Sequence, residues 1–168
     1  MADIFSKQKR SEIMSKVRSK NTKPEETVRK YLFSKGFRYR KNVKTLPGSP
    51  DIVLPKYKTV IFVNGCFWHG HNCSKGKLPE TRKEFWEYKI NANIQRDKKN
   101  YELLKKQGWK VIVVWECELK SKKIREKTLK NLENKLKSSI WMKIKDFIKE
   151  KDGVYILEKV LNKDKTWI

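Results

Sequence analysis

The chain has 168 residues, which suits one domain built around a single hydrophobic core. It contains 42 Lys and Arg against 19 Asp and Glu, a formal net charge of +23, and its residues are 38% hydrophobic and 11% aromatic. This composition excludes a disordered basic tail, a collagen, a coiled coil and a low-complexity protein. The charge predicts a polyanionic partner. We favour nucleic acid as this partner. The alternative is that the charge only solvates a lysine-rich surface, and an anionic membrane surface is the third possibility.

The apolar segments of the chain are short. Residues 1–14 contain no apolar stretch of the signal-peptide type, and the longest apolar runs, 60–63 and 111–115, have the length of strands. We therefore expect a soluble, cytoplasmic protein. Three cysteines do not suit a disulfide framework, which leaves a metal site or reduced thiols.

The N-terminal part predicts an arm followed by a helix. Residues 1–20 are basic and weakly patterned, so we expect a short surface helix or a mobile arm that contacts a partner. Thr22 and Glu25 stand at capping-box spacing with Pro24 between them, and Gly36 supplies a stop signal. The prediction is a helix over 24–35. Strands are then expected over 37–42, 51–54 and 59–63, before a loop over 64–79.

The second half predicts two helices and one strand. A helix over 81–107 ends at Gly108, and residues 109–115 form a nearly continuous apolar run that suits a central strand covered on both faces. Residues 121–150 have a lysine-rich helical pattern. Together these elements predict an α/β fold with a mixed central sheet flanked by helices. We expect an arm at 1–20, a single domain at 21–150 and a tail of unknown role at 151–168.

Histidine and cysteine cluster in one loop. Four of the five His and Cys residues lie within 66–73, and Cys117 follows the predicted strand. A tetrahedral, structural zinc site is predicted, because thiolate and imidazole are its preferred ligands and a four-ligand site has no open position. Its ligands would be Cys66, His71, Cys73 and Cys117. The alternative is three buried, reduced cysteines and a surface histidine.

His69 is left over as a candidate general base, although a single loop histidine is also commonly a solvated residue. Asp97 lies on the apolar face of the predicted helix, and Glu25 shares a face with Val28 and Leu32. Inward carboxylates need a metal or a buried ion pair, and both alternatives stay open. Asp51 opens a strand, where it is either a turn aspartate or a ligand for magnesium.

Aromatic residues flank the same loop. Phe67 and Trp68 are adjacent in it, and Trp86 lies near the start of the next helix. In a basic protein such rings either pack in the core or stack on and wedge between bases.

Several segments carry a family resemblance. They are LPGSPD at 46–51, VIFVNGCFWH at 60–69, His71, Cys73, TR at 81–82, FW at 85–86, Asn93, RD at 96–97 and GWKVIVVWEC at 108–117. In order and spacing, from about residue 9 to 120, the chain closely resembles the very-short-patch mismatch repair endonucleases. The resemblance implies a restriction-endonuclease-like core. It also implies a magnesium-dependent nick in double-stranded DNA, 5′ of the thymine in a T:G mismatch that arises from 5-methylcytosine deamination.

The resemblance also implies roles for single residues. Asp51 and the main-chain carbonyl of Val63 would be magnesium ligands. His69 would activate water, Asp97 would orient its imidazole, and Glu25 would contribute to the hydrated metal shell. The four zinc ligands match the family's structural site. The family's DNA wedge would be formed by Phe67, Trp68 and Trp86 from the major groove and Met14 from the minor groove.

One position departs from the family pattern. The best-studied pattern has a histidine where this chain has Asn64, which can donate a hydrogen bond to the scissile phosphate but cannot carry a proton or a charge. A nearby Lys or Arg would then share the stabilisation of charge. The alternatives are a restriction-type or structure-specific endonuclease, or a zinc-stabilised DNA-binding module without catalysis. We expect a monomer linked to a cytosine-5 methyltransferase and repair proteins, with no membrane partner.

Overall fold

The computed structural model describes residues 6–16 and 20–150, and the predicted tail at 151–168 lies outside the described residues. The chain divides into two compact units, residues 1–131 and 132–168. In the second unit the described residues continue helix α4 (Lys122–Glu150), where Lys137 Nζ lies 2.7 Å from Glu133 Oε1. The division falls inside the 21–150 range, and the domain boundaries stay a prediction.

The N-terminal elements follow the predicted helix signals. Helix α1 (Lys7–Ser15) is the short surface helix expected within the arm. Helix α2 (Lys23–Ser34) begins with a complete capping box between Thr22 and Glu25 and has Pro24 in its first turn. The helix ends before Gly36, which has a φ of 81°. Glycine adopts this positive φ readily because it has no side chain. The predicted helix over 24–35 is confirmed.

A mixed four-stranded sheet forms the centre of the first unit in the described residues, as predicted. Its strands, in both chain and sheet order, are β1 (Arg40–Lys41), β2 (Ile52–Leu54), β3 (Thr59–Asn64) and β4 (Lys110–Trp115). Strands β1, β2 and β3 pair antiparallel, whereas β3 and β4 pair parallel with Val63 opposite Val114 and Asn64 opposite Trp115.

Two strand predictions need correction. The strand expected over 37–42 is only two residues long, because Phe37 N donates to Leu32 O and so belongs to the end of α2. The run at 109–115 is not the central strand: β4 is the edge of the sheet in the described residues, and its burial is uneven. Strand β3 is paired on both sides and all six of its residues are buried. A continuous apolar run shows that a strand is buried, but it does not show which strands pair with it.

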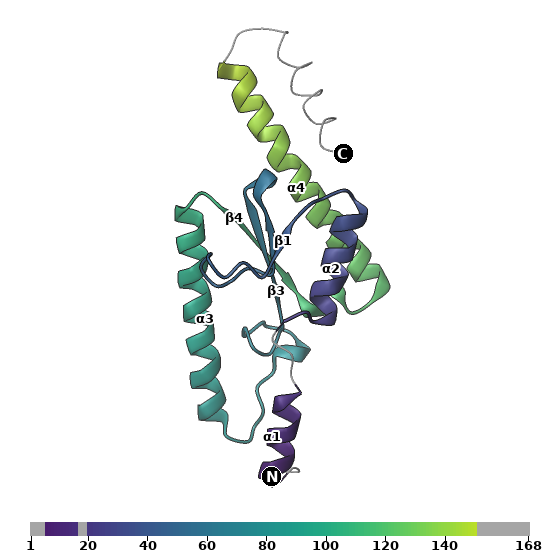
Figure 1. Cartoon of the computed structure of the whole chain (residues 1–168). Coiled ribbons are helices and arrows are strands. Elements are labelled where there is room, and N and C mark those ends of the chain that lie inside the picture. The colour runs from purple at the N-terminus through teal and green to yellow at the C-terminus, as the bar shows by residue number, and fades with distance from the viewer. Residues whose placement is uncertain (1–5, 17–19, 151–168) are drawn as a thin grey trace. The chain divides into compact units, whose positions relative to one another are not determined.

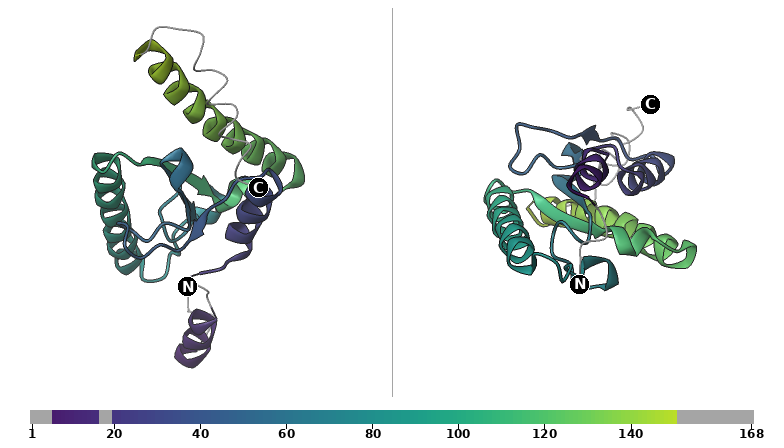
Figure 2. Two further views of the ribbon diagram at one scale, coloured as in Figure 1. Left: turned by 45° about the horizontal axis from the view of Figure 1, so that its top comes forward. Right: turned by 90° about the horizontal axis from the view of Figure 1, so that it is seen from below.

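Helices flank the sheet on both sides. Helix α2 and helix α3 (Lys83–Lys106) lie on opposite sides of it, as all views agree (Figures 1 and 2). The inner face of α3 is the apolar face predicted for this helix, with Ile90 and Leu104 buried and Asp97 and Tyr101 partly buried. Leu104 packs with Phe62 and other side chains of the sheet, and each such buried side chain contributes about 1.5 to 3 kcal/mol.

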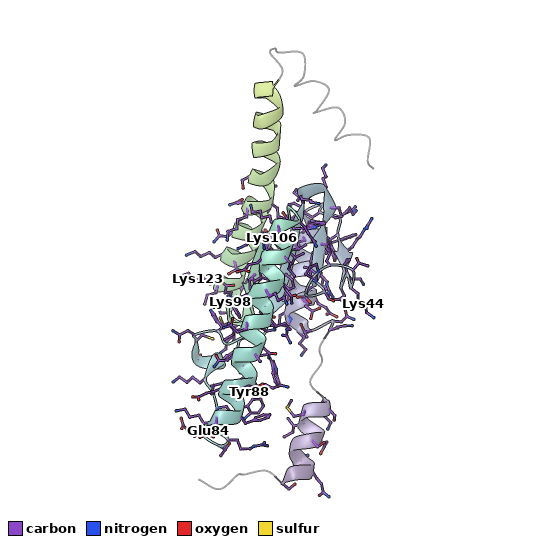
Figure 3. The ribbon with its side chains drawn as sticks, turned by 90° about the vertical axis from the view of Figure 1, so that its left-hand side faces the viewer. Lys44, Glu84, Tyr88, Lys98, Lys106 and Lys123 are labelled. Carbon is purple, nitrogen blue, oxygen red and sulfur yellow. The ribbon has the colours of Figure 1, made fainter. Side chains whose placement is uncertain are left out.

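The outer face of α3 is basic and exposed. Lys98, Lys106 and Tyr88 project from it, and Tyr88 is 80% exposed (Figure 3).

None of the helices in the described residues has the length and hydropathy that crossing a bilayer requires. Polar residues such as Asp51 and Asn64 lie at the ends of strands β2 and β3.

Candidate active site and metal centre

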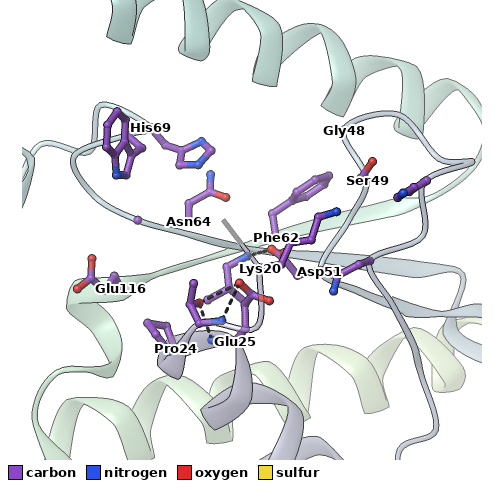
Figure 4. Close-up of a pocket in the computed structure, with 16 residues that line it drawn as sticks. Lys20, Pro24, Glu25, Gly48, Ser49, Asp51, Phe62, Asn64, His69 and Glu116 are labelled. Carbon is purple, nitrogen blue, oxygen red and sulfur yellow. Dashed lines mark hydrogen bonds between the residues drawn. The ribbon is translucent and has the colours of Figure 1, made fainter. Parts of the chain in front are cut away.

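A pocket of about 620 Å³ opens where the loop before β2, the end of β3 and the start of α2 meet. Figure 4 shows its lining. Five of the residues predicted for catalysis or magnesium binding line it together: Glu25, Asp51, Val63, Asn64 and His69. The structure therefore gathers residues from four separate segments of the sequence at one place.

Asp51 stands just before β2 and turns its carboxylate toward the end of β3. Its Oδ2 accepts a hydrogen bond from Val63 N at 2.8 Å, so the carboxylate lies beside the main chain that carries the Val63 carbonyl. Burial raises the pKa of Asp51 from 3.8 to about 6, and the Val63 hydrogen bond opposes this shift. A carboxylate buried in this way would be stabilised by a cation bound in the pocket.

Glu25 lies at the base of the pocket, and both of its carboxylate oxygens accept hydrogen bonds from the protein. Its two oxygens accept four hydrogen bonds, from Asn21 N, Thr22 N, Thr22 Oγ1 and Arg29 Nη2. The Arg29 pair is buried on both sides, with an N···O distance of 2.9 Å. Arg29 Nη2 also donates to Asp51 O at 3.1 Å. The inward orientation of Glu25 is confirmed, and the buried ion pair considered as an alternative is present.

His69 is held by a carboxylate of α3. Its Nδ1 lies 2.5 Å from Asp97 Oδ2, with the histidine side chain 27% exposed and the aspartate side chain 16% exposed. Two further contacts fix the loop against α3. Asn93 Nδ2 donates to Trp68 O at 3.0 Å, and Gly70, at φ +62°, leaves no room for a Cβ, which would lie 2.5 Å from Ile94 Cδ1. His69 is therefore an oriented side chain and not a freely solvated one.

Asn64, the position that departs from the family pattern, is buried at the end of β3. Its Nδ2 donates to Tyr101 Oη at 3.0 Å. Burial raises the pKa of Tyr101 to about 12, against the opposing hydrogen bond from Asn64. The phenol is thus neutral throughout the physiological pH range.

The predicted metal centre is assembled. The ligand atoms of four residues lie within 4.8 Å of one another: Cys66, His71, Cys73 and Cys117. The His71 ring stacks on Trp115 with a centroid distance of 4.2 Å and an interplanar angle of 12°. These three thiols and one imidazole form a site able to hold a metal ion, three of them in the loop after β3 and Cys117 just after β4.

The aromatic residues form one cluster beside the pocket. Phe67 lies 5.1 Å from both Trp68 and Trp86, measured between ring centroids, and Trp68 lies 6.0 Å from Trp86. All three rings are partly exposed. Trp68 and Trp86 also line a groove of about 440 Å³ together with Met14 and Phe85. The four predicted wedge residues thus lie near one another on the surface, and the rings are not core side chains.

Other pocket residues were not foreseen. Glu116 lines the pocket and forms an ion pair with Lys75 at 2.5 Å. The parallel register of β3 and β4 places Trp115 opposite Asn64, so that Glu116 follows directly at the end of the paired strands, and no pattern within the sequence indicates this pairing. Lys20 and Lys44 also line the pocket, but among 42 basic residues no pattern distinguishes them.

The fold and the site together define the class: the chain is a DNA endonuclease with a restriction-endonuclease-like fold. Residues 2–75 match the profile of the family DNA mismatch endonuclease Vsr. The chain is 56% identical over 140 residues to the type II nicking enzyme V.NmeAIP of Neisseria meningitidis, covering 83% of this chain and 100% of the relative.

Two further relatives agree. The type II nicking enzyme V.XorIIP of Xanthomonas oryzae is 48% identical, covering 79% of this chain and 97% of the relative. The DNA mismatch endonuclease Vsr of Escherichia coli is 41% identical, covering 73% of this chain and 78% of the relative. The chain belongs to the Vsr family of DNA mismatch endonucleases, and its substrate is DNA. The resemblance seen in the sequence is confirmed.

Proposed function

We propose that the chain nicks one strand of double-stranded DNA 5′ of the thymine in a T:G mismatch left by deamination of 5-methylcytosine. The reaction is a magnesium-dependent phosphodiester hydrolysis that initiates very-short-patch repair. The observation that carries this proposal is the placement of Trp68 and His69 in one anchored loop, which puts an aromatic surface for bases directly beside an oriented histidine. The names of the relatives, a mismatch endonuclease and nicking enzymes, support it.

Magnesium fits the oxygen donors of the pocket. The Asp51 carboxylate and the Val63 carbonyl are hard oxygen ligands, and the buried Asp51 favours a cation. Bound there, Mg²⁺ would stabilise the negative charge that develops on the scissile phosphate. Glu25 would hold water in the metal's hydration shell and not coordinate it directly, because both of its oxygens already accept hydrogen bonds.

His69 removes the proton from the water that attacks the phosphorus. Asp97 binds Nδ1 of the imidazole, which leaves Nε2 as the atom that accepts this proton. Asp97 also stabilises the imidazolium that forms. Lys20 and Lys44, at the edge of the same pocket, contribute positive charge toward the phosphate in place of the charge that Asn64 lacks.

Zinc is the metal proposed for the Cys₃His centre. All four positions of a tetrahedral zinc would be filled by protein, so the ion would stabilise the loop and take no part in hydrolysis. The loop it holds begins next to Asn64 and includes His69. The zinc centre would thereby keep the general base and the aromatic residues in place.

The aromatic cluster selects the lesion. Phe67, Trp68 and Trp86 enter the base stack from the major groove, while Met14 enters from the minor groove. Unstacking a step costs a few kcal/mol and costs least at a mispaired base, so the wedge opens mismatched steps preferentially. An asymmetric lesion with one cut needs only a monomer. The enzyme would act in the cytoplasm on the nucleoid, in functional association with a cytosine-5 methyltransferase and repair proteins.

Strand-resolved cleavage tests this function. Duplexes that differ only by T:G or C:G in a methylated-cytosine context are incubated with and without Mg²⁺, using the wild-type chain and His69→Ala. We expect magnesium-dependent nicking of the T strand of the T:G duplex, and its loss in the variant. Cutting of both duplexes would instead indicate a restriction-type nuclease. Tight binding without cleavage under any divalent metal would indicate a non-catalytic DNA-binding module.

A further inference from the structure

Helix α3 contacts two polar residues of the pocket from one face. Asp97 holds His69, and Tyr101, four residues later, accepts a hydrogen bond from Asn64 Nδ2 at 3.0 Å. Residues at this spacing lie one above the other on a helix. The same face of α3 therefore sets the positions of both the histidine and the asparagine of the pocket.

The Tyr101 hydroxyl is itself held in place. Its ring packs against Phe62, with a centroid distance of 4.9 Å and an interplanar angle of 50°. Phe62 is 7% exposed and belongs to strand β3, two residues before Asn64. Tyr101 has little freedom to move away from Asn64, so the bond between them also restrains the Asn64 amide.

The restrained amide presents one end to the pocket. Figure 4 shows the nitrogen of Asn64 directed toward α3 and its oxygen directed toward the side of Asp51. Nδ2 donates to Tyr101 on α3, and Oδ1 is the end of the amide that lies on the side of Asp51. A hydrogen-bond acceptor at this place suits a water molecule and not a phosphate oxygen.

We propose that Tyr101 is a positioning residue for the nicking reaction, fixing the Asn64 amide so that Oδ1 accepts a hydrogen bond from the hydrolytic water. This inference rests on the proposed function. The water has two protons: one is directed to His69 and then transferred to it, and the other is held by Asn64 Oδ1. Its lone pair is thereby aimed at the phosphorus, which forms the new P–O bond as the bond to the leaving oxygen breaks. Tyr101 stays neutral and exchanges no proton.

A double-mutant cycle tests the coupling. Tyr101→Phe, Asn64→Ala and the double variant are compared in single-turnover nicking of a T:G duplex, with DNA affinity measured separately. Tyr101→Phe is expected to lower the rate constant about tenfold and to leave the Kd for DNA within twofold, because it removes one hydrogen bond that orients the water. In the Asn64→Ala background the same change should have little further effect. The matched control is Tyr88→Phe, which removes an exposed hydroxyl from the same helix.

A second readout needs no DNA. The side-chain amide resonances of Asn64, assigned by their loss in Asn64→Ala, should shift in Tyr101→Phe and stay unchanged in Tyr88→Phe. Independent, multiplicative rate effects in the cycle would overturn the inference while leaving the proposed function intact. A weaker Kd in Asn64→Ala with an unchanged rate constant would also overturn it, since this would show that Asn64 binds phosphate. Failure of the wild-type chain to nick the T:G duplex would overturn both proposals.

Discussion

His69 Nδ1 lies 2.5 Å from Asp97 Oδ2, although the two residues are 28 positions apart in the chain. The contact joins the loop after β3 to the inner face of α3. It defines which ring nitrogen of His69 is bonded within the protein and which is available to a substrate. The proposed role of His69 as a base depends on this geometry.

Replacing either member of the pair should reduce nicking without weakening DNA binding. We expect His69→Ala to lower the single-turnover rate constant by about 10³-fold, because a positioned general base contributes about 10² to 10⁴-fold. Asp97→Asn should lower it by about 10²-fold, since the amide no longer stabilises the imidazolium. Glu84→Gln, at an exposed position of α3, is the control. Unchanged rates in both variants would remove His69 from the mechanism.

The Asp51 carboxylate should destabilise the magnesium-free protein above acidic pH. Its pKa is about 6 in the folded chain and 3.8 ordinarily, so between these values the folded state retains a proton that the unfolded state has released. Stability from this group therefore falls as the pH rises from about 4 to 6. In urea unfolding in magnesium-free buffer, Asp51→Asn should gain roughly 2 to 3 kcal/mol over the wild type between pH 4 and pH 7. Parallel pH profiles of the two proteins would contradict the raised pKa.

Removing one partner of the buried ion pair between Glu25 and Arg29 should lower the stability of the folded chain strongly. Glu25→Ala leaves the Arg29 guanidinium buried without its carboxylate and removes part of the capping box, so we expect a loss of about 3 to 5 kcal/mol. Glu25→Gln should lose less, because its amide oxygen still accepts hydrogen bonds. Chemical denaturation at pH 7 measures both. Glu12→Gln, in an exposed pair on α1, should change stability very little, and an equally small loss in Glu25→Ala would contradict the burial of the pair.

Metal removal should separate the structural centre from the catalytic one. Purified protein is expected to contain one zinc per chain by elemental analysis. Cys117→Ser should lower both the zinc content and the Tm, because it removes a ligand that joins β4 to the loop. When wild-type protein has been treated with a chelator, adding Zn²⁺ should restore the Tm, whereas adding Mg²⁺ should not. Zinc-free protein with an unchanged Tm and full activity would rule out this role for the centre.

Salt should weaken DNA binding steeply. With a net charge of +23 we expect at least about five phosphate contacts, which gives a slope of log K against log salt of about −4.5 or steeper. Lys20→Gln, in the pocket lining, should reduce the magnitude of the slope by about one. Fluorescence anisotropy with a T:G duplex measures both slopes. A flat profile would mean that the basic residues do not contact the phosphates.

Local signals in the sequence were sufficient for several elements. The capping box of Thr22 and Glu25 predicted the start of α2, because both partners lie within one helical turn. The apolar periodicity of α3 placed Asp97 on the inner face, since periodicity indicates which side of a helix is buried. The Cys and His cluster was found by residue type and spacing alone.

Pairing between distant segments was decided by the tertiary structure. Strand β4 was predicted at the centre of the sheet and lies at its edge, because hydropathy does not specify strand partners. The bond between Asn64 and Tyr101 depends on the packing of α3 against β3, which no local pattern reports. The same holds for the four hydrogen bonds of Glu25 and for the inclusion of Glu116 in the pocket.

By itself, then, the sequence determined the chemical inventory of this protein: its helices and most strands, its candidate metal ligands, its candidate base and its charge. These properties follow from residue type and short-range periodicity. Only the tertiary structure decided which atoms of these residues meet. Hydrogen bonds such as those of His69 with Asp97 and Asn64 with Tyr101 require positions accurate to a few tenths of an ångström, and the packing of separate elements sets those positions.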